Sequence, residues 1–217
     1  MSTNHGYLTD TRDQVVMGEC PALMNPIFGK LSPPEPYKHR FCVGKDGVYI
    51  EAQNSVFEVR LPVAHSKIPL PYGEVKSSGV FLKYGKIPRW IFNTAFDLAN
   101  KSSPKEWAGL VVWDKEKQEY LLYEPEVISS SEGGISYRTY LPENYLMVMD
   151  LHSHGVLDAF FSKTDDRSDI SGFYIAGVFG RCHLSEGMKK NQTATRMVVN
   201  GNFIDCQDFS CFFKDGT

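Results

Sequence analysis

The strongest constraint on the fold is a helical apolar pattern that is followed directly by an apolar strand pattern. Between residues 87 and 101, apolar side chains recur at helical spacing at Ile91, Ala95, Leu98 and Ala99. Pro88 suits the first turn of such a helix, because its missing N–H needs no partner there. The seven residues Trp107–Trp113 are all apolar and predict a buried strand. We therefore expect a helix packed against a sheet.

Shorter runs of β-type sequence lie on both sides of this helix. In the first half they cover residues 40–43, 48–51 and 55–61, and Lys45-Asp46-Gly47 predicts a hairpin turn between the first two. In the second half we expect a short helix near residues 165–171 and strands at residues 120–123, 135–140, 145–151, 173–178, 195–199 and 209–213. The first forty residues show no regular pattern. The predicted fold class is α+β, an α/β sandwich in which helices flank a sheet.

A boundary between two parts of the chain is expected soon after a proline-rich stretch, Pro69–Gly73. A chain of 217 residues is long enough for one elaborated domain or for two small ones. We place a smaller β-rich N-terminal module of unknown role at residues 1–85. The helix-and-sheet domain then covers residues 86–217.

The composition excludes several classes of protein. With 23 basic and 26 acidic side chains, the formal net charge is -3, which argues against nucleic-acid binding driven by bulk charge. No apolar run approaches the roughly 18 residues that span a bilayer, and the first residues lack the basic and apolar segments of a secretory signal. Five cysteines without a Cys-x-x-Cys pair are typical of reduced thiols. We expect a soluble cytoplasmic protein with no membrane partner and no direct nucleic-acid partner.

The most specific chemical feature is a pair of histidines, His152 and His154, at the end of an apolar run. On a strand, residues two apart project from the same face, so two imidazoles can converge on one ion. Asp165, eleven residues after His154, can return through a loop and a helix start to supply an oxygen ligand. Two histidines and one carboxylate with an open fourth position form the pattern of a catalytic Zn²⁺ site. The open position would hold a water whose pKa the metal lowers toward about 7.

Each part of this pattern also has an ordinary structural reading. A His-x-His pair alone is common in proteins without metal. Ser162-x-x-Asp165 alone is more often a helix N-cap than part of an active site, and Ser162 can cap the helix in either case. Asp166 and Asp169 follow closely and are alternatives to Asp165 as the third ligand.

A general base for such a metal site is available upstream in Glu106-Trp107-Ala108-Gly109. Hydrolysis at a metal needs a carboxylate close to the water but not bound to the metal. Glu106 lies between the predicted helix and the buried strand, where its side chain can reach a cleft, although a solvated loop acid is the ordinary reading. Gly109 within the apolar run is consistent with a close approach.

Together, Glu106-x-x-Gly109, His152-x-His154 and, after seven more residues, Ser162-x-x-Asp165 resemble the JAMM metalloprotease signature of the JAB/MPN+ family. The resemblance covers the chain from about Ile87 onward. It implies a β-sheet flanked by helices, one Zn²⁺ per chain and His152, His154 and Asp165 as its ligands. It further implies that Glu106 is the catalytic acid/base and that Ser162 donates to the oxyanion of the tetrahedral intermediate.

One position departs from this family pattern. Many members carry proline after the second histidine, where this chain has Gly155, which we expect to loosen the loop that leads to Ser162.

The family resemblance implies hydrolysis of peptide or isopeptide bonds, typically after the C-terminus of ubiquitin or a ubiquitin-like protein. The layout, an N-terminal extension before a bacterial-type JAB domain, resembles protein A of the plasmid-associated ParB-related, ThiF-related cassette. That implies a ubiquitin-like or sulfur-carrier-like protein substrate and an E1-like, ThiF-like partner. The alternatives are a JAB-fold scaffold without hydrolytic activity in a plasmid-maintenance assembly, and a zinc enzyme with a small substrate.

Overall fold

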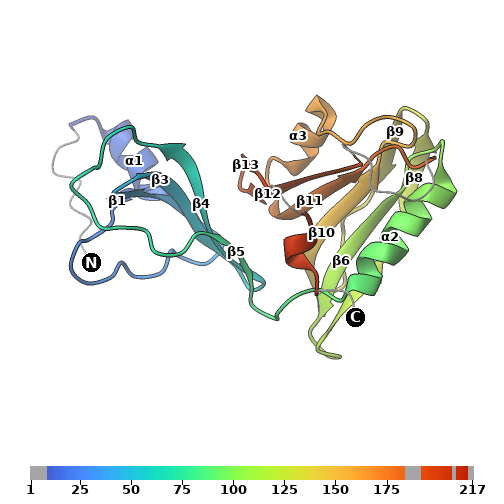
Figure 1. Ribbon diagram of the computed structural model, residues 1–217, viewed down its shortest axis with the longest axis horizontal. Coiled ribbons are helices and arrows are strands. Elements are labelled where there is room, and N and C mark those ends of the chain that lie inside the picture. Colours follow the sequence, from blue (N-terminus) through green and yellow to red (C-terminus); the bar gives the residue numbers. More distant parts are fainter. Residues whose placement is uncertain (1–8, 184–191, 207–208, 215–217) are drawn as a thin grey trace. The chain divides into compact units, whose positions relative to one another are not determined.

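A computed structural model describes residues 9–183, 192–206 and 209–214 (Figure 1). The chain divides into two compact units, Met1–Lys83 and Tyr84–Thr217. The described residues form an α+β fold with a β-rich N-terminal part, as the sequence predicts. Each unit has its own sheet, and each is described by itself below.

The first unit is built on a five-stranded sheet with strand order β1-β2-β3-β4-β5. Strand β1 pairs with β2 in parallel, and the other neighbours are antiparallel. The elements of this unit are α1 (Thr11–Glu19), β1 (Ala22–Met24), β2 (His39–Gly44), β3 (Gly47–Gln53), β4 (Phe57–His65) and β5 (Gly79–Leu82).

The predicted hairpin turn is confirmed, and the irregular reading of the first forty residues is wrong. Gly44 pairs with Gly47 across β2 and β3, so Lys45 and Asp46 form the turn. Helix α1 begins after Asp10, whose side chain accepts a hydrogen bond from the backbone N–H of Arg12. The apolar residues of α1, Val15 to Met17, are consecutive and not at helical spacing, so periodicity does not reveal this helix, and none of its nine residues is buried.

The second unit contains a six-stranded sheet of order β13-β12-β11-β10-β6-β7 and a separate two-stranded sheet of β8 and β9. Strands β10 and β11 are parallel, with α3 in the connection between them, and the other neighbours are antiparallel. The elements are α2 (Arg89–Ser102), β6 (Ala108–Asp114), β7 (Glu119–Tyr123), β8 (Val127–Ser131), β9 (Gly134–Tyr137), β10 (Tyr145–Ser153), α3 (Lys163–Asp169), β11 (Phe173–Phe179), β12 (Thr193–Val199), β13 (Asn202–Asp205) and the 3-10 helix η1 (Phe209–Phe212).

The predicted helix and buried strand are confirmed as α2 and β6. The apolar stripe of α2 is buried at Ile91, Ala95 and Ala99, and this helix packs along β6, β7 and β10 (Figure 1). Every residue of β6 is buried. The helix and the strand therefore form the centre of the core.

One face of the six-stranded sheet packs in the apolar core, and the other lines a cleft. An added side chain at Gly177 of β11 would meet Leu151 and Phe209, so this face belongs to the apolar core. Residues of the opposite alternation, including Asp150 and His152 of β10, line a cleft. Because side chains alternate along a strand, β10 supplies the core with one set and the cleft with the other.

The strand predicted at residues 209–213 is wrong, because residues 209–212 form η1. Phe209 and Phe213 both pack against the ring of Phe92 from α2, with centroids 5.2 and 5.3 Å away. Alternation along a strand also places residues four apart on one face, but a helical turn spaces them about 8 Å apart along the axis and a strand about 13 Å. The rings of Phe209 and Phe213 stack with centroids 5.4 Å apart. The aromatic cluster with α2 therefore favours the turn.

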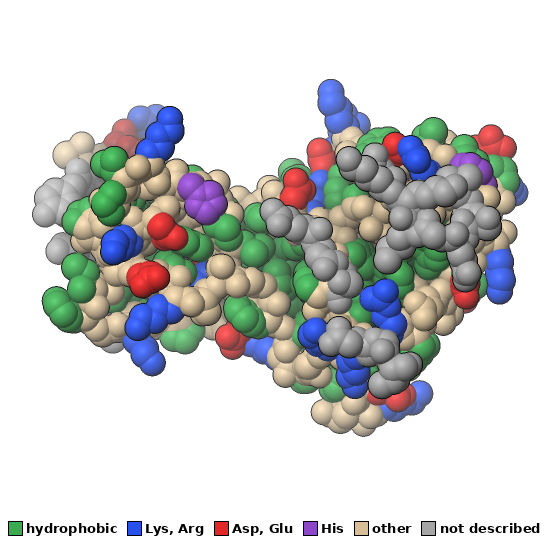
Figure 2. Space-filling model, in the orientation of Figure 1, with side chains coloured by type: hydrophobic (Ala, Val, Ile, Leu, Met, Phe, Trp, Pro, Cys, Tyr) green, Lys and Arg blue, Asp and Glu red, His purple; other side chains and the backbone are tan. Residues whose placement is uncertain are grey.

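No described helix has the length and apolar character needed to cross a membrane. On the face shown in Figure 2, basic and acidic side chains both occur, and several basic ones gather in the lower part of the second unit.

Candidate metal centre

The end of β10 places both predicted histidines at the same cleft. His152 pairs with Ala108 of β6 on one side and with Val178 of β11 on the other. His154 follows the last residue of the strand, and its backbone N–H donates to the carbonyl of Phe179 over 2.8 Å. Two sheet neighbours thus fix the backbone from which both imidazoles project.

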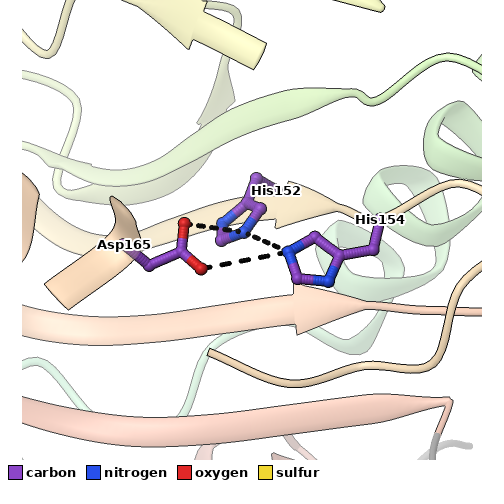
Figure 3. Close-up of side chains that lie close together, drawn as sticks. All are labelled: His152, His154 and Asp165. Atoms are coloured by element: carbon purple, nitrogen blue, oxygen red, sulfur yellow. Dashed lines mark hydrogen bonds and ion pairs between the residues drawn. The ribbon is translucent and has the colours of Figure 1, made fainter. Parts of the chain in front are cut away.

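Helix α3 brings Asp165 to these imidazoles (Figure 3). Its Oδ1 lies 3.4 Å from Nε2 of His152, and its Oδ2 lies 3.9 Å from Nε2 of His154. Ser162 and Asp165 form a capping box: the Ser162 N–H donates to Oδ2 over 2.6 Å, and the Asp165 N–H donates to the Ser162 Oγ over 3.3 Å. The cap fixes the carboxylate at the helix start, so Ser162 does cap the helix.

The other two aspartates of α3 are held elsewhere. Arg196 of β12 donates to Asp166 over 2.6 Å and to Asp169 over 2.7 Å. Its guanidinium lies between the rings of Phe161 and Phe203, about 4 Å from each centroid. The structure therefore turns Asp165, and neither alternative, toward the histidines. It also anchors α3 to the sheet through Arg196.

The protonation and spacing of the three side chains fit a metal ion. Burial lowers the pKa of His152 to about 4 and lowers that of His154 as well, so both rings are neutral at neutral pH. Metal ligands must be deprotonated in this way. The two Nε2 atoms are 3.2 Å apart, and two ligands of a tetrahedral Zn²⁺ are about 3.3 Å apart. The chemistry of the donor set and its spacing therefore suit Zn²⁺, while the ligand roles themselves stay predictions.

Glu106 lines the same cleft from the residue pair before β6. Its backbone N–H donates to the carbonyl of Ser131, and its carbonyl accepts from the hydroxyl of Ser130, so the β8–β9 sheet holds it in place. Its side chain is buried, and burial together with the charge of Asp165 raises the pKa of its carboxyl to about 7. Such a carboxyl can both accept and release a proton near neutral pH.

Strands β6 and β10 are joined next to the cleft, which sets the position of Glu106 relative to the histidines. The backbone N–H of Trp107 donates to the Ser153 hydroxyl over 2.8 Å, and the Ser153 N–H donates to the Trp107 carbonyl over 2.8 Å. Ser153, which stands between the two histidines in the sequence, is completely buried. This double contact ties the segment that carries Glu106 to the segment that carries the imidazoles.

The cleft has a volume of about 480 Å³ and is lined by all five predicted site residues. One wall is the β8–β9 turn and strand β9, from Gly133 to Tyr137, and another is the loop before α3, with Leu157 and Phe160. The ring of Phe160 packs edge-on against the imidazole of His154, with centroids 4.5 Å apart. The predicted residues thus share one concave site with polar and apolar walls.

Sequence reasoning missed a set of buried and half-buried polar side chains that also line the cleft. The Tyr137 hydroxyl donates to Asp150 over 2.6 Å, and the Tyr174 hydroxyl donates to Asp169 over 2.7 Å. Burial raises the pKa of Asp150 to about 7, although the Tyr137 hydrogen bond opposes this. Asp150 had a local signal, since it lies two residues before His152 and therefore on the same strand face. The tyrosines had none, because they reach the cleft only through the tertiary fold.

Two glycines beside the site permit close packing. The Trp107 side chain lies over Gly109, where an added Cβ would overlap its ring, so the close approach predicted there is by an indole. Gly155 has φ +53°, and an added Cβ would overlap the carbonyl of Pro104. Gly155 therefore does not loosen the loop: it lets the chain turn in a conformation that proline cannot adopt.

Two protein-family models match separate parts of the chain, one in each compact unit. Residues 90–197 match the model of prokaryotic homologs of the JAB domain. The second unit is therefore similar to JAB-family domains over residues 90–197. Residues 10–82 match a domain of unknown function, DUF2016. A search of curated proteins gave no match to the chain. The JAB domain is compatible with a hydrolase, and it contains the His152, His154 and Asp165 cluster that can hold a metal ion.

Proposed function

We propose that the JAB domain is a zinc-dependent metallopeptidase or isopeptidase that hydrolyses an amide bond. The observation that carries the proposal is the convergence of His152, His154 and Asp165 on one cleft that also holds the buried carboxyl of Glu106. A structural zinc site needs four protein ligands and no base. Three ligands with a nearby uncoordinated carboxyl are the arrangement that metal-assisted hydrolysis requires.

His152, His154 and Asp165 are the residues that would hold the ion. A bound Zn²⁺ supplies Lewis-acid chemistry, in that it polarises the scissile carbonyl and lowers the pKa of water. The three side chains need little rearrangement for this, because strand pairing fixes the histidines and the capping box fixes the aspartate. Such preorganisation keeps the cost of binding low.

Glu106 acts as the proton carrier. Burial raises the pKa of its carboxyl to about 7 in the metal-free protein, and a nearby cation favours the ionised form, which can take a proton from the attacking water and then pass it to the leaving nitrogen. Both transfers occur within the cleft, because Glu106 and the three candidate ligands line the same cavity. The amine can leave only once it is protonated, so this residue controls the breakdown of the tetrahedral intermediate.

Ser162 stabilises the oxyanion of that intermediate. Its Oγ accepts from the Asp165 N–H, so the hydroxyl proton remains available to donate into the cleft. A donor held by a helix cap needs no reorganisation as charge develops on the substrate oxygen. The same contact therefore serves both the fold and the reaction.

The proposed substrate is a ubiquitin-like or sulfur-carrier-like protein, cut at its C-terminus, and the proposed partner is an E1-like, ThiF-like enzyme in a bacterial cytoplasm. The support for this step is the layout of the chain, with a separate module at residues 10–82 before the JAB domain. It is also supported by the resemblance of that layout to the plasmid cassette protein.

The test combines metal content with cleavage. Protein purified with metal present should contain one zinc per chain by elemental analysis, and it should cleave a ubiquitin-like C-terminal fusion. The Glu106→Gln variant should keep its zinc and lose at least about 100-fold in kcat. Zinc-free wild-type protein would contradict the proposal, and equal cleavage by the variant would remove Glu106 from its role. Zinc without cleavage, together with co-purifying partners, would instead indicate a binding module.

A further inference from the structure

The sheet of the first unit carries a row of three charged side chains across its central strands. Arg40 of β2 pairs in register with Glu51 of β3, which pairs with Arg60 of β4. Residues paired in this way lie side by side on one face of the sheet. Nε of Arg40 donates to Oε2 of Glu51 over 2.8 Å, and Nε of Arg60 donates to Oε1 over 2.5 Å.

This row contains more positive than negative charge. Both oxygens of the single carboxylate are taken, one by each guanidinium. The side chains of Glu51 and Arg40 are 3% and 8% exposed, whereas that of Arg60 is 38% exposed. Arg40 places a further N–H on the carbonyl of Ser32 over 2.7 Å. The excess charge therefore sits at Arg60, the member of the row that is open to solvent. A charge held against a sheet is stabilised by a counter-ion.

A cavity of about 470 Å³ lies over this end of the row, with Glu51 and Arg60 in its lining. Two loops form the rest of the lining, residues 25–31 and 73–77, and they add Lys30, Lys76 and Ser77. Glu74 is the second acidic residue of the lining, so its cations outnumber its carboxylates. With Arg40 beneath, the local charge is more positive still.

The walls of this cavity are held in place by contacts between the two loops. The Asn25 side-chain amide donates to the carbonyls of Gly73 and Glu74 over 3.1 and 3.0 Å. The Gly73 N–H returns a hydrogen bond to the Asn25 carbonyl over 2.9 Å. An added Cβ at Gly73 would overlap the carbonyl of Pro26, which shows how closely the loops pack. A cavity with fixed walls loses little entropy when a ligand enters.

We propose that this cavity binds an oxyanion, a carboxylate or phosphate group, with Arg60 as its principal donor and Lys30 and Lys76 as supporting charges. A planar guanidinium can bind a carboxylate or a phosphate with two parallel hydrogen bonds. Arg60 already orients its Nε toward Glu51 and one terminal nitrogen toward the Ser77 hydroxyl, 3.3 Å away. Glu51 thus acts as a positioning residue, and the anion supplies the charge that the row lacks.

The test is a titration of the full chain followed by two-dimensional NMR of the backbone amides. Sodium phosphate and sodium acetate are added separately, each against sodium chloride of the same ionic strength. We expect saturable shifts confined to the amides of residues 25–31 and 73–77. Arg60→Gln should weaken binding by at least about tenfold and Lys76→Gln by a smaller factor, while Lys38→Gln, a change at an exposed lysine outside the cavity, should leave it unchanged.

The outcomes separate the two ligand classes and the two sites of the protein. A response to phosphate alone identifies a phosphoryl ligand, and a response to acetate alone identifies a carboxylate such as a peptide C-terminus. Binding that survives Arg60→Gln with shifts near His152 belongs to the JAB cleft and overturns the proposal. Lys76→Gln keeps the Arg40–Glu51–Arg60 row intact, so the test holds even if Arg60→Gln fails to fold. Shifts no larger than those with chloride would refute the site.

Discussion

Replacing the buried acid Glu106 by glutamine should stabilise the metal-free protein at alkaline pH. The folded-state pKa of Glu106 is about 7, raised from 4.5 by burial and by Asp165. The folded protein therefore holds a proton that the unfolded chain has released between these two values. At pH 4 the carboxyl is protonated in both the folded and the unfolded state. As the pH rises from 4.5 to 7, the free energy of unfolding of the wild type decreases. Glutamine has no charge to bury and escapes this loss.

The size of the effect follows from the same shift. At about 1.36 kcal/mol per pKa unit, the change from 4.5 to about 7 sets an upper value of about 3 kcal/mol. Water that enters the open cleft screens part of this, so we expect the variant to gain about 1–3 kcal/mol at pH 8 and close to nothing at pH 4. The gain should shrink on addition of Zn²⁺, because a nearby cation favours the ionised carboxyl.

The assay is urea unfolding of wild type and Glu106→Gln with EDTA present, at several values of pH between 4 and 8. Glu132→Gln is the matched control, since Glu132 is an exposed acid in the β8–β9 turn. The difference in free energy of unfolding between this control and wild type should not depend on pH. If Glu106→Gln is no more stable than wild type at pH 8, the argument from burial is wrong. It is also wrong if the stability difference between the variant and wild type does not change with pH.

Three further changes test other parts of the site. Asp165→Asn should weaken Zn²⁺ binding by more than about 100-fold in a competition assay with a chelating dye, and Asp97→Asn on the exposed face of α2 should not; equal affinities would exclude Asp165 as a ligand. Arg196→Met should lower the free energy of unfolding by about 3–5 kcal/mol, because it strands two aspartates of α3; a loss below about 1 kcal/mol in urea unfolding would show that this anchor is unimportant. Gly155→Ala should cost about 2–4 kcal/mol through its positive φ and its overlap with a backbone carbonyl. Gly133→Ala, which faces open space, should stay within about 0.5 kcal/mol of wild type, and similar melting temperatures for both glycine variants would contradict this packing.

The parts of the fold that the sequence predicts are those with a strong local period. The stripe of α2 and the apolar run of β6 are visible because each buries one continuous face or a whole strand. Helix α1 buries nothing and has no such stripe. The aromatic residues at 209–213 fit either period, and only their packing against Phe92 of α2 decides between them.

The candidate site likewise contains some residues that a local pattern predicts and others that only the tertiary fold brings together. His152, His154 and Asp165 lie within fourteen residues, so strand and helix geometry alone place them close together. The position of Glu106 depends on the antiparallel pairing of β6 with β10, which no local pattern specifies. Tyr137 reaches the cleft, and Arg196 reaches the aspartates of α3, from strands that are distant in the sequence, so their partners become visible only in three dimensions.

The parallel pairing of β10 with β11 across α3 places the three candidate metal ligands on a short, nearly self-contained segment of chain. Glu106, the candidate base, lies 46 residues upstream of His152 and just before β6, which pairs with the other edge of β10. Mutations can therefore remove one capability and leave the other intact. A descendant of this domain that lost Glu106 would keep the three candidate ligands, and an ion bound there would be a fixed positive charge in the cleft. The candidate metal site and its candidate base can therefore be inherited separately on one scaffold.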